Sequence, residues 1–401
     1  MSDEDIAVTK FREYLRIRTD QPEPDYESCV KFLFALADEL GIERVRVEPV
    51  TGYPFVVMTI PGKAPQLSAI VLHSHTDVVP VYREKWTHDP FSGDKDEKGN
   101  IYGRGAQDMK SNGIQYFEAI RRHFSRGIKE FKRNVHIIWG PDEERGSRNG
   151  MEKFLESQEF QKLNIGFVLD EGMASEDQIY RVYYAERCKW WIRVSFTGRP
   201  GHGSRIIDNS AAEKMLSFLN SALKFRESQK VLLESDPTKT LGDVTTLNLT
   251  MIKGGVETNV VPADFECEFD IRVPPTVDFD ALEKEINEWA QKAGKGTKIE
   301  FILHKTFKNM TPHMAGDPFW EAFENVLKKE RCTFRNEIFP AGTDSGLIRE
   351  KGYRSIGFSP IINTQCLLHD HDEFLNERVY LRGVEIYEKL IEALANIDEE
   401  K

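Results

Sequence analysis

The sequence has no excess of positive charge. Its 401 residues include 66 Asp and Glu against 54 Lys and Arg, which gives a formal net charge of −12. Nucleic-acid binding needs clustered Lys and Arg to neutralise phosphates, so this balance argues against a nucleic-acid partner. Small molecules are the expected partners.

Long apolar runs are also missing. No stretch approaches the roughly 18 apolar residues of a membrane-spanning helix, and the beginning, MSDEDIAVTKFREYL, lacks the basic start and apolar core of a secretory signal. We therefore expect neither membrane insertion nor secretion. Five cysteines are scattered singly along the chain without metal-type pairs, which favours free thiols and a cytoplasmic location: Cys29, Cys188, Cys267, Cys332 and Cys366.

Signatures of nucleophilic catalysis are weak. The sequence contains no GxSxG nucleophile elbow, and its cysteines lie in no recognisable catalytic motif. Hydrolysis through a serine or cysteine is therefore a poor explanation of this chain.

Helix and strand patterns alternate in the first part of the sequence. Apolar residues recur at helical spacing from Cys29 to Leu40, and Gly41 is the expected end of that helix. Further elements are expected at 55–60 and 69–73 (strands), 112–123 (helix), and 135–139 and 165–169 (strands). This alternation predicts an α/β fold with a layered central sheet.

The pattern changes near residue 184. Strand and helix patterns then follow in the order βαββαβ, which predicts an inserted ferredoxin-like α+β domain of roughly 120 residues. The α/β pattern resumes at 355–358 and ends in an amphipathic helix. Because 401 residues exceed the usual size of one core, we expect a catalytic domain in two segments, 1–183 and 305–401, interrupted by an inserted domain at 184–304.

Histidine and carboxylate side chains occur in five separated clusters. They are His75 and Asp77 in HSHTDVVP, Asp108 in GRGAQDMKSNG, Glu143 and Glu144 in PDEERGS, Asp170 and Glu171 in LDEG, and His369 and His371 in LLHDHDEFL. Several follow expected strands, and α/β sheets bind ligands at the carboxyl ends of strands. Imidazole nitrogens and carboxylate oxygens are zinc ligands when no thiolates are offered. Two zinc ions that share a carboxylate need about this number of ligands.

Local chemistry suggests individual roles. Residues two apart in a strand share a face, so the Asp77 carboxylate is expected to bond the far nitrogen of His75. Asp108 precedes a helix, where its carboxylate either reaches both metals or caps the helix. Of Glu143 and Glu144, one can bind metal while the other accepts a proton from water. Read singly, each cluster also fits an ordinary turn or a solvated surface.

In their order, HSHTDVVP, YGRGAQDMK, PDEE, LDEG and LLHDHDE resemble the motifs of the co-catalytic zinc hydrolases, the family of carboxypeptidase G, succinyl-diaminopimelate desuccinylase and aminoacylase. The resemblance spans nearly the whole chain, and GRPGHGS, GGVETNVVPA, FDIRV and GFSP are most similar to the aminoacylases. It implies a zinc-exopeptidase-like catalytic domain with a central mixed sheet, an inserted domain that serves as lid and dimerisation domain, and two zinc ions per subunit of a homodimer.

Carried over residue by residue, the resemblance implies two sets of metal ligands: His75, Asp108 and Glu171 for one zinc, and Asp108, Glu144 and His369 for the other, with Asp108 bridging. Glu143 matches the general base of the family, and Asp77 matches the residue that supports the first histidine. The family's last ligand lies four residues before Glu373, which selects His369 over His371.

Three residues of the inserted domain also match family positions. His202, a surface turn histidine on its sequence alone, matches one that reaches the partner subunit's site and helps polarise the scissile carbonyl. Asn259 and Arg272 match substrate contacts; the guanidinium suits a carboxylate, although a strand arginine in an ion pair is the alternative. Gly346 stands where relatives commonly have an arginine, so Arg272 or Arg349 takes that role or the preferred amino acid differs.

The predicted activity is zinc-dependent hydrolysis of N-acyl-L-amino acids to a carboxylate and a free L-amino acid. A dipeptidase or carboxypeptidase with the same metals is the alternative. A non-catalytic binding protein with this fold is less favoured, because every expected metal and base position is occupied.

Overall fold

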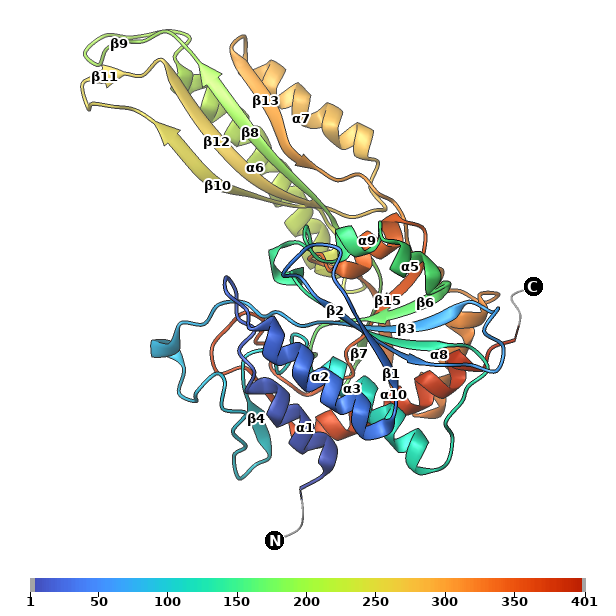
Figure 1. Cartoon of the computed structure of the whole chain (residues 1–401). Coiled ribbons are helices and arrows are strands. Elements are labelled where there is room, and N and C mark those ends of the chain that lie inside the picture. Colours follow the sequence, from blue (N-terminus) through green and yellow to red (C-terminus); the bar gives the residue numbers. More distant parts are fainter. Residues whose placement is uncertain (1–3, 399–401) are drawn as a thin grey trace. The chain divides into compact units, whose positions relative to one another are not determined.

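The computed structural model describes residues 4–398, which divide into two compact units (Figure 1). The first contains residues 4–184, 311–336 and 343–398, and the second contains 185–310 and 337–342. The second unit thus runs six residues beyond the expected end at 304 and takes in a short later segment that the sequence pattern assigned to the catalytic domain.

The first unit is built around an eight-stranded mixed sheet of order β1-β2-β5-β3-β6-β15-β7-β14. Its strands are β1 (Glu43–Val47), β2 (Phe55–Ile60), β3 (Ala69–His75), β5 (Val135–Gly140), β6 (Ile165–Asp170), β7 (Tyr180–Glu186), β14 (Phe334–Phe339) and β15 (Arg354–Gly357). The central strands β5, β3, β6 and β15 are parallel to one another, whereas β1, β2 and β7 pair antiparallel. The expected α/β class with a central mixed sheet is confirmed.

Helices cover both faces of this sheet (Figure 1). They are α1 (Ile6–Leu15), α2 (Tyr26–Leu40), α3 (Lys110–Ser125), α4 (Met151–Phe154), α5 (Gln158–Lys162), α8 (Pro318–Lys329), α9 (Asp344–Glu350) and α10 (Glu377–Ala395). Side chains alternate across a strand, so Val56 and Met58 enter the core with α1, α2, α3, α8 and α10, while Phe55 and Val57 pack with α4, α5 and α9. The helix α2 ends as expected at Gly41, whose φ of 66° suits glycine.

The second unit contains a four-stranded antiparallel sheet of order β10-β12-β8-β13. Its elements follow the chain as β8 (Cys188–Thr197), α6 (Ala211–Ser235), β10 (Thr246–Gly254), β12 (Asp264–Val273), α7 (Phe279–Ala293) and β13 (Thr297–His304). The predicted βαββαβ order is confirmed. Trp190, Phe218 and Trp289 lie in its separate core.

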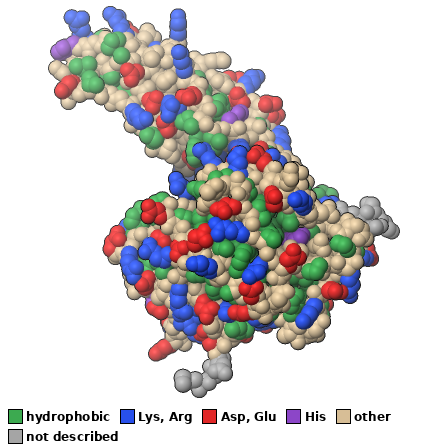
Figure 2. All heavy atoms as spheres, viewed as in Figure 1, with side chains coloured by type: hydrophobic (Ala, Val, Ile, Leu, Met, Phe, Trp, Pro, Cys, Tyr) green, Lys and Arg blue, Asp and Glu red, His purple; other side chains and the backbone are tan. Residues whose placement is uncertain are grey.

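Short elements complete the described chain: β4 (Asn100–Tyr102) pairs with β16 (Phe374–Asn376), β9 (Gly201–His202) pairs with β11 (Val260–Val261), and single 3-10 turns are η1 (Arg83–Lys85), η2 (Glu143–Arg145) and η3 (Leu241–Asp243). No helix within residues 4–398 has both the length and the apolar composition needed to cross a bilayer. The face drawn in Figure 2 carries a mixture of acidic and basic side chains.

The parallel strands determine where functional side chains gather. The strand β3 ends at His75, β6 ends at Asp170 next to Glu171, and β5 ends at Gly140 shortly before Glu143. Because parallel neighbours end at the same edge of a sheet, these three turns lie together.

The separate core of the second unit leads to a stability prediction. Phe218 is fully buried, and its ring contacts those of Phe196, Phe269 and Trp289. We expect Phe218→Ala to lower the free energy of unfolding by about 3–5 kcal/mol, because it leaves a cavity among aromatic rings. Asn220→Ala, exposed on the same helix, should change it by less than about 0.5 kcal/mol. Equal effects in urea denaturation would contradict the assigned core.

Candidate metal centre

Asp108 lies between two histidines that are far apart in sequence. Its Oδ1 is 2.9 Å from Nε2 of His75, and its Oδ2 is 3.3 Å from Nε2 of His369. Asp108 does not cap the following helix, since α3 has Met109 as its N-cap and no capping side chain. One carboxylate therefore presents an oxygen to each of two imidazoles.

Two glutamates complete the groups on either side of Asp108. Glu171 Oε2 is 3.6 Å from His75 Nε2, and Glu144 Oε2 is 3.1 Å from His369 Nε2. Glu143 lies on the His75 side, where its carboxylate, Glu171 and His75 offer ligand atoms within 4.8 Å of one another. The sequence-predicted metal ligands and Glu143 thus come together in the first unit. His371 instead lies beside Asp370 and the ring of Tyr82.

Asp77 differs from its expected arrangement. The Nδ1 atom of His75 bonds the main-chain oxygen of Asp77 at 2.8 Å, while the Asp77 carboxylate lies 3.9 Å away. That carboxylate instead accepts hydrogen bonds from the main-chain N–H groups of Glu143 and Glu144, and from the amide of Gln21. Asp77 lies beyond the end of β3, so the side-by-side geometry of a strand does not apply to it. Its side chain orients the two glutamates, and its backbone orients the histidine.

Several buried carboxylates lie close together in this cluster, and their burial and mutual repulsion change the pKa values of its members. Burial raises the pKa of Glu143 well above its usual value, and neighbouring Glu171 adds to the effect. Burial, followed by the charge of Asp108, raises the pKa of Glu144 to about 7. Hydrogen bonds to Asp108 and Glu144 raise the pKa of His369 to about 10. Without another cation, the cluster therefore retains protons to offset its negative charge.

The donor set fits metal ions in place of those protons. It consists of imidazole nitrogens and carboxylate oxygens without thiolates, as zinc and similar divalent ions accept. Glu144 Oε1 is buried and has no hydrogen-bond partner among the described residues. An unpaired carboxylate oxygen in such a place is costly unless a cation or a water molecule meets it.

Residues of the second unit form separate local arrangements. His202 is exposed; its Nδ1 lies 2.7 Å from Ser204 Oγ, and its backbone pairs with Val260. The main-chain oxygen of Asn259 accepts a hydrogen bond from the N–H of Gly203. The segments that carry His202 and Asn259 therefore lie side by side.

Both candidate arginines are engaged by groups of this chain. Arg272 on β12 bonds both oxygens of Asp270, through Nε at 2.6 Å and Nη2 at 2.9 Å, the ion pair anticipated as its alternative. Arg349 is 1% exposed and donates to the main-chain oxygens of Ser355 and Tyr183. Of the alternatives considered for Gly346, the one that uses Arg349 is not supported, because its guanidinium is bound to main-chain oxygens inside the fold.

Sequence reasoning missed several supporting residues. The carboxylate of Asp344 bonds His73, two residues before His75, and also Ser147, shortly after Glu144. Gln107 and Glu373 similarly connect the segments of Asp108 and His369. Gln107 and Glu373 lie inside the motifs already noted, but nothing local in those motifs reveals that they meet.

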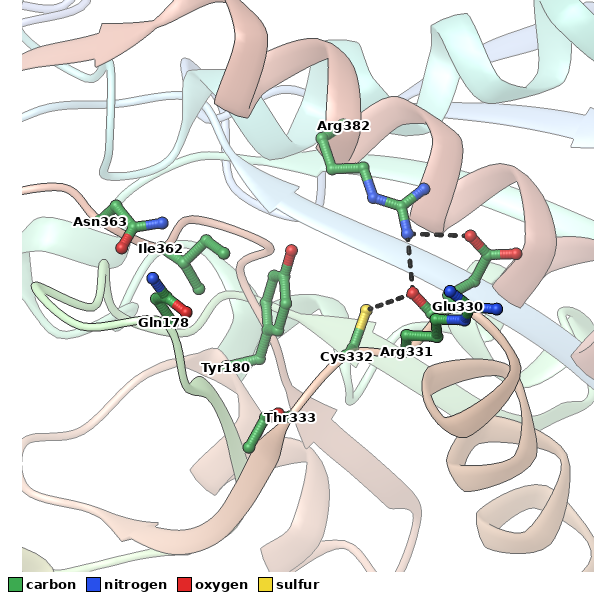
Figure 3. A pocket seen from close by; sticks show the side chains of 9 residues that line it. All are labelled: Gln178, Tyr180, Glu330, Arg331, Cys332, Thr333, Ile362, Asn363 and Arg382. Carbon is green, nitrogen blue, oxygen red and sulfur yellow. Dashed lines mark hydrogen bonds and ion pairs between the residues drawn. The ribbon is translucent and has the colours of Figure 1, made fainter.

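A groove of roughly 290 Å³ lies elsewhere on the first unit (Figure 3). It is lined by Gln178, Tyr180, Glu330, Arg331, Cys332, Thr333, Ile362, Asn363 and Arg382. Arg382 is already paired with Glu330 and Glu385. The groove shares no residue with the metal cluster.

Known proteins match this chain along nearly its whole length. The model of peptidase family M20/M25/M40 matches residues 71–393. Aminoacylase-1 of Sus scrofa is 51% identical over 391 residues, covering 98% of this chain and 96% of the relative. Aminoacylase-1 of Homo sapiens is 49% identical over 395 residues, with 98% and 97% covered. Aminoacylase-1 of Dictyostelium discoideum is 46% identical over 407 residues, with 98% and 99% covered.

The chain belongs to the aminoacylase-1 family of M20 peptidases.

Solved structures share the M20 fold at lower identity. An M20 metallo-carboxypeptidase of Sulfolobus solfataricus superposes with a TM-score of 0.73 at 17% identity, covering 98% of this chain and all of the other. A dinuclear metal-binding M20 peptidase of Bacillus subtilis gives a TM-score of 0.66 at 16% identity, with 96% and 98% covered. The family and fold expected from the motifs are confirmed, and the protein is an M20 amidohydrolase.

The buried carboxylates of this M20 protein predict that the stability of the metal-free protein depends on pH. The pKa of Glu143 is raised on folding from its usual 4.5, so its protonated form stabilises the fold below that pH, and this contribution is lost as pH rises through the folded-state pKa. Glu143→Gln, neutral at every pH, should therefore make the chelated protein more stable than the parent at pH 8, with a smaller difference at pH 4.5.

Thermal unfolding of chelator-treated proteins measures this difference. Glu152→Gln, exposed on α4, is the matched control and should show little change at either pH. A Glu143→Gln protein less stable than its parent at pH 8 would show that this carboxylate is not crowded.

Proposed function

We propose that this amidohydrolase uses two zinc ions per subunit to hydrolyse N-acyl-L-amino acids to a carboxylate and a free L-amino acid. The placement of Asp108 carries the proposal, because one carboxylate faces both His75 and His369. The aminoacylase-1 relatives, at 46–51% identity over 98% of this chain, support the substrate class.

The cluster divides naturally into two ligand sets around Asp108. His75, Asp108 and Glu171 would hold one zinc, and Asp108, Glu144 and His369 the other. When bound, such ions polarise a substrate carbonyl and lower the pKa of water. The paired distances on each side of Asp108 support this division over one that uses His371.

Glu143 is the proposed proton carrier. It offers a ligand atom on the His75 side of the cluster, and the two ligand sets proposed above are complete without it. Its carboxylate takes a proton from the attacking water as oxygen bonds the acyl carbon, and returns it to nitrogen as the amide C–N bond breaks. Asp77 positions Glu143 for both transfers through its bond to the Glu143 N–H at 3.1 Å.

The second unit supplies the remaining proposed contacts. His202 helps polarise the scissile carbonyl in the partner subunit's site, and Asn259 and Arg272 contact the substrate. His202 is free enough for such a role, since its described side-chain bond is to Ser204 alone. Arg272 keeps Nη1 outside its two bonds to Asp270, which leaves a donor for a substrate carboxylate.

A homodimer is the proposed assembly. Leu216 and Leu223, seven residues apart on α6, are each more than half exposed. The edge strand β10 also exposes Leu249 and Met251 beside its unpaired backbone edge. An apolar helix face next to an open strand edge suits a second copy of the same unit.

The five free cysteines suit a cytoplasmic, reducing location.

A substrate panel tests the proposed activity. N-acetyl-L-methionine should be hydrolysed with a far higher kcat/KM than N-succinyl amino acids or dipeptides. Preference for dipeptides, with metal still required, would assign the protein to the dipeptidase alternative. Binding of N-acetyl-L-methionine without turnover in zinc-loaded protein would instead support a non-catalytic binding protein.

The role of Glu143 gives a mutational prediction. Glu143→Gln should lower kcat by at least about 100-fold, because the proton carrier is lost, while zinc content stays at the parental value. Glu152→Gln should keep both activity and zinc. Parental activity in Glu143→Gln would remove this residue from the mechanism.

The proposed shared site predicts complementation between subunits. His202→Ala and Glu143→Ala proteins should each be inactive, but refolding them together should restore about a quarter of parental activity, since half of random dimers contain one intact site. Verified mixed dimers without activity would show that His202 does not act across the interface.

A further inference from the structure

Two segments far apart in sequence are braced against each other beside the metal cluster. The turn 104–108 leads into Asp108, and the loop 365–374 carries His369. The carboxylate of Glu373 accepts hydrogen bonds from the main-chain N–H groups of Gly105 at 3.1 Å, Gln107 at 2.6 Å and Asp108 at 3.3 Å. It also pairs with Arg104 at 2.7 Å. One end of the loop is thus attached to the turn.

Gln107 makes the reciprocal connection from the turn to the loop. Its Nε2 donates to the main-chain oxygens of Gln365 and Phe374, each at 2.9 Å, and its Oε1 accepts from the N–H of Leu367 at 3.0 Å. The residue is 1% exposed. A single buried amide therefore holds both ends of the loop, and its three bonds are shielded from competing water.

His369 depends on such support more than His75 or Glu171 does. His75 ends a central strand and Glu171 follows one, but His369 lies in a loop between β15 and β16. Its side chain is 55% exposed, and its φ is 61°, a conformation that non-glycine residues adopt infrequently. The imidazole therefore reaches Asp108 and Glu144 only if the loop is held in place.

We propose that Gln107 is a positioning residue that presets the His369 loop for the second metal ion. The inference rests on the proposed metal pair and goes beyond it, because it assigns separate supports to the two metal positions. Gln107 acts through the loop backbone and contributes no ligand of its own.

The other side of the cluster has its own support. Ser359 Oγ bonds both the N–H and the oxygen of Gly172, next to Glu171, and receives a hydrogen bond from Asn112 at 2.9 Å. None of these bonds involves the 365–374 loop. Loss of the Gln107 amide should therefore weaken one metal position and spare the other.

Zinc titration of metal-free protein against a chromophoric chelator tests this separation. For Gln107→Met, which keeps the length of the side chain but removes its amide, one zinc should bind with parental affinity and the second about 10–100-fold more weakly. Amide hydrogen exchange should increase across 365–374. A purely structural role would lower thermal stability without separating the two affinities.

Gln115→Met is the matched control. Gln115 is fully buried on α3 and donates its amide to the main-chain oxygen of Tyr380 on α10. This variant should lose stability yet keep both zinc affinities and parental exchange in the loop.

If folded Gln107→Met binds both zinc ions with the affinities of the parent protein, the inference is overturned while the proposed function stays intact. A parent protein that binds no zinc would instead contradict the metal pair itself. If Gln107→Met does not fold, Gln107→Asn retains the amide on a shorter side chain. It should weaken the second zinc selectively, and an unchanged second affinity would again overturn the inference.

Discussion

The position of Asp108 between two imidazoles is the constraint on which the rest of the site depends. Its oxygens face His75 and His369 separately, with Glu171 and Glu144 beyond them. Burial, followed by repulsion from neighbouring carboxylates, raises the pKa values of Glu143 and Glu144. Divalent ions held by these residues would remove the same conflict, and they would supply the means to activate water.

The fold supports this arrangement with elements of different rigidity. Parallel central strands deliver His75 and Glu171 to one edge of the sheet, where backbone pairing already determines their positions. His369 arrives on a loop and depends on side-chain bonds from Gln107 and Glu373. This difference is the basis for proposing that Gln107, which belongs to neither proposed ligand set, affects one metal position.

Much of this could be predicted from sequence because the signals are local. Apolar strand patterns located β3 and β6, and the residues at their ends identified His75 and Glu171 as candidates. Local patterns do not reveal the geometry of turns, and they do not reveal hydrogen bonds between residues that are distant in sequence. The strand pattern predicts that the Asp77 carboxylate bonds His75. Asp77 lies beyond the end of the strand, however, and its main-chain oxygen makes this bond instead. The sequence around Arg349 does not indicate that its guanidinium donates hydrogen bonds to buried main-chain oxygens. The Gln107 amide bonds partners about 260 positions away, which no periodicity reports.

Anomalous diffraction at the zinc edge from zinc-loaded crystals can show whether Asp108 bridges two metal ions. We expect two peaks per chain within coordination distance of Asp108, one beside His75 and Glu171 and the other beside Glu144 and His369. A single peak, or two peaks that do not share Asp108, would contradict it.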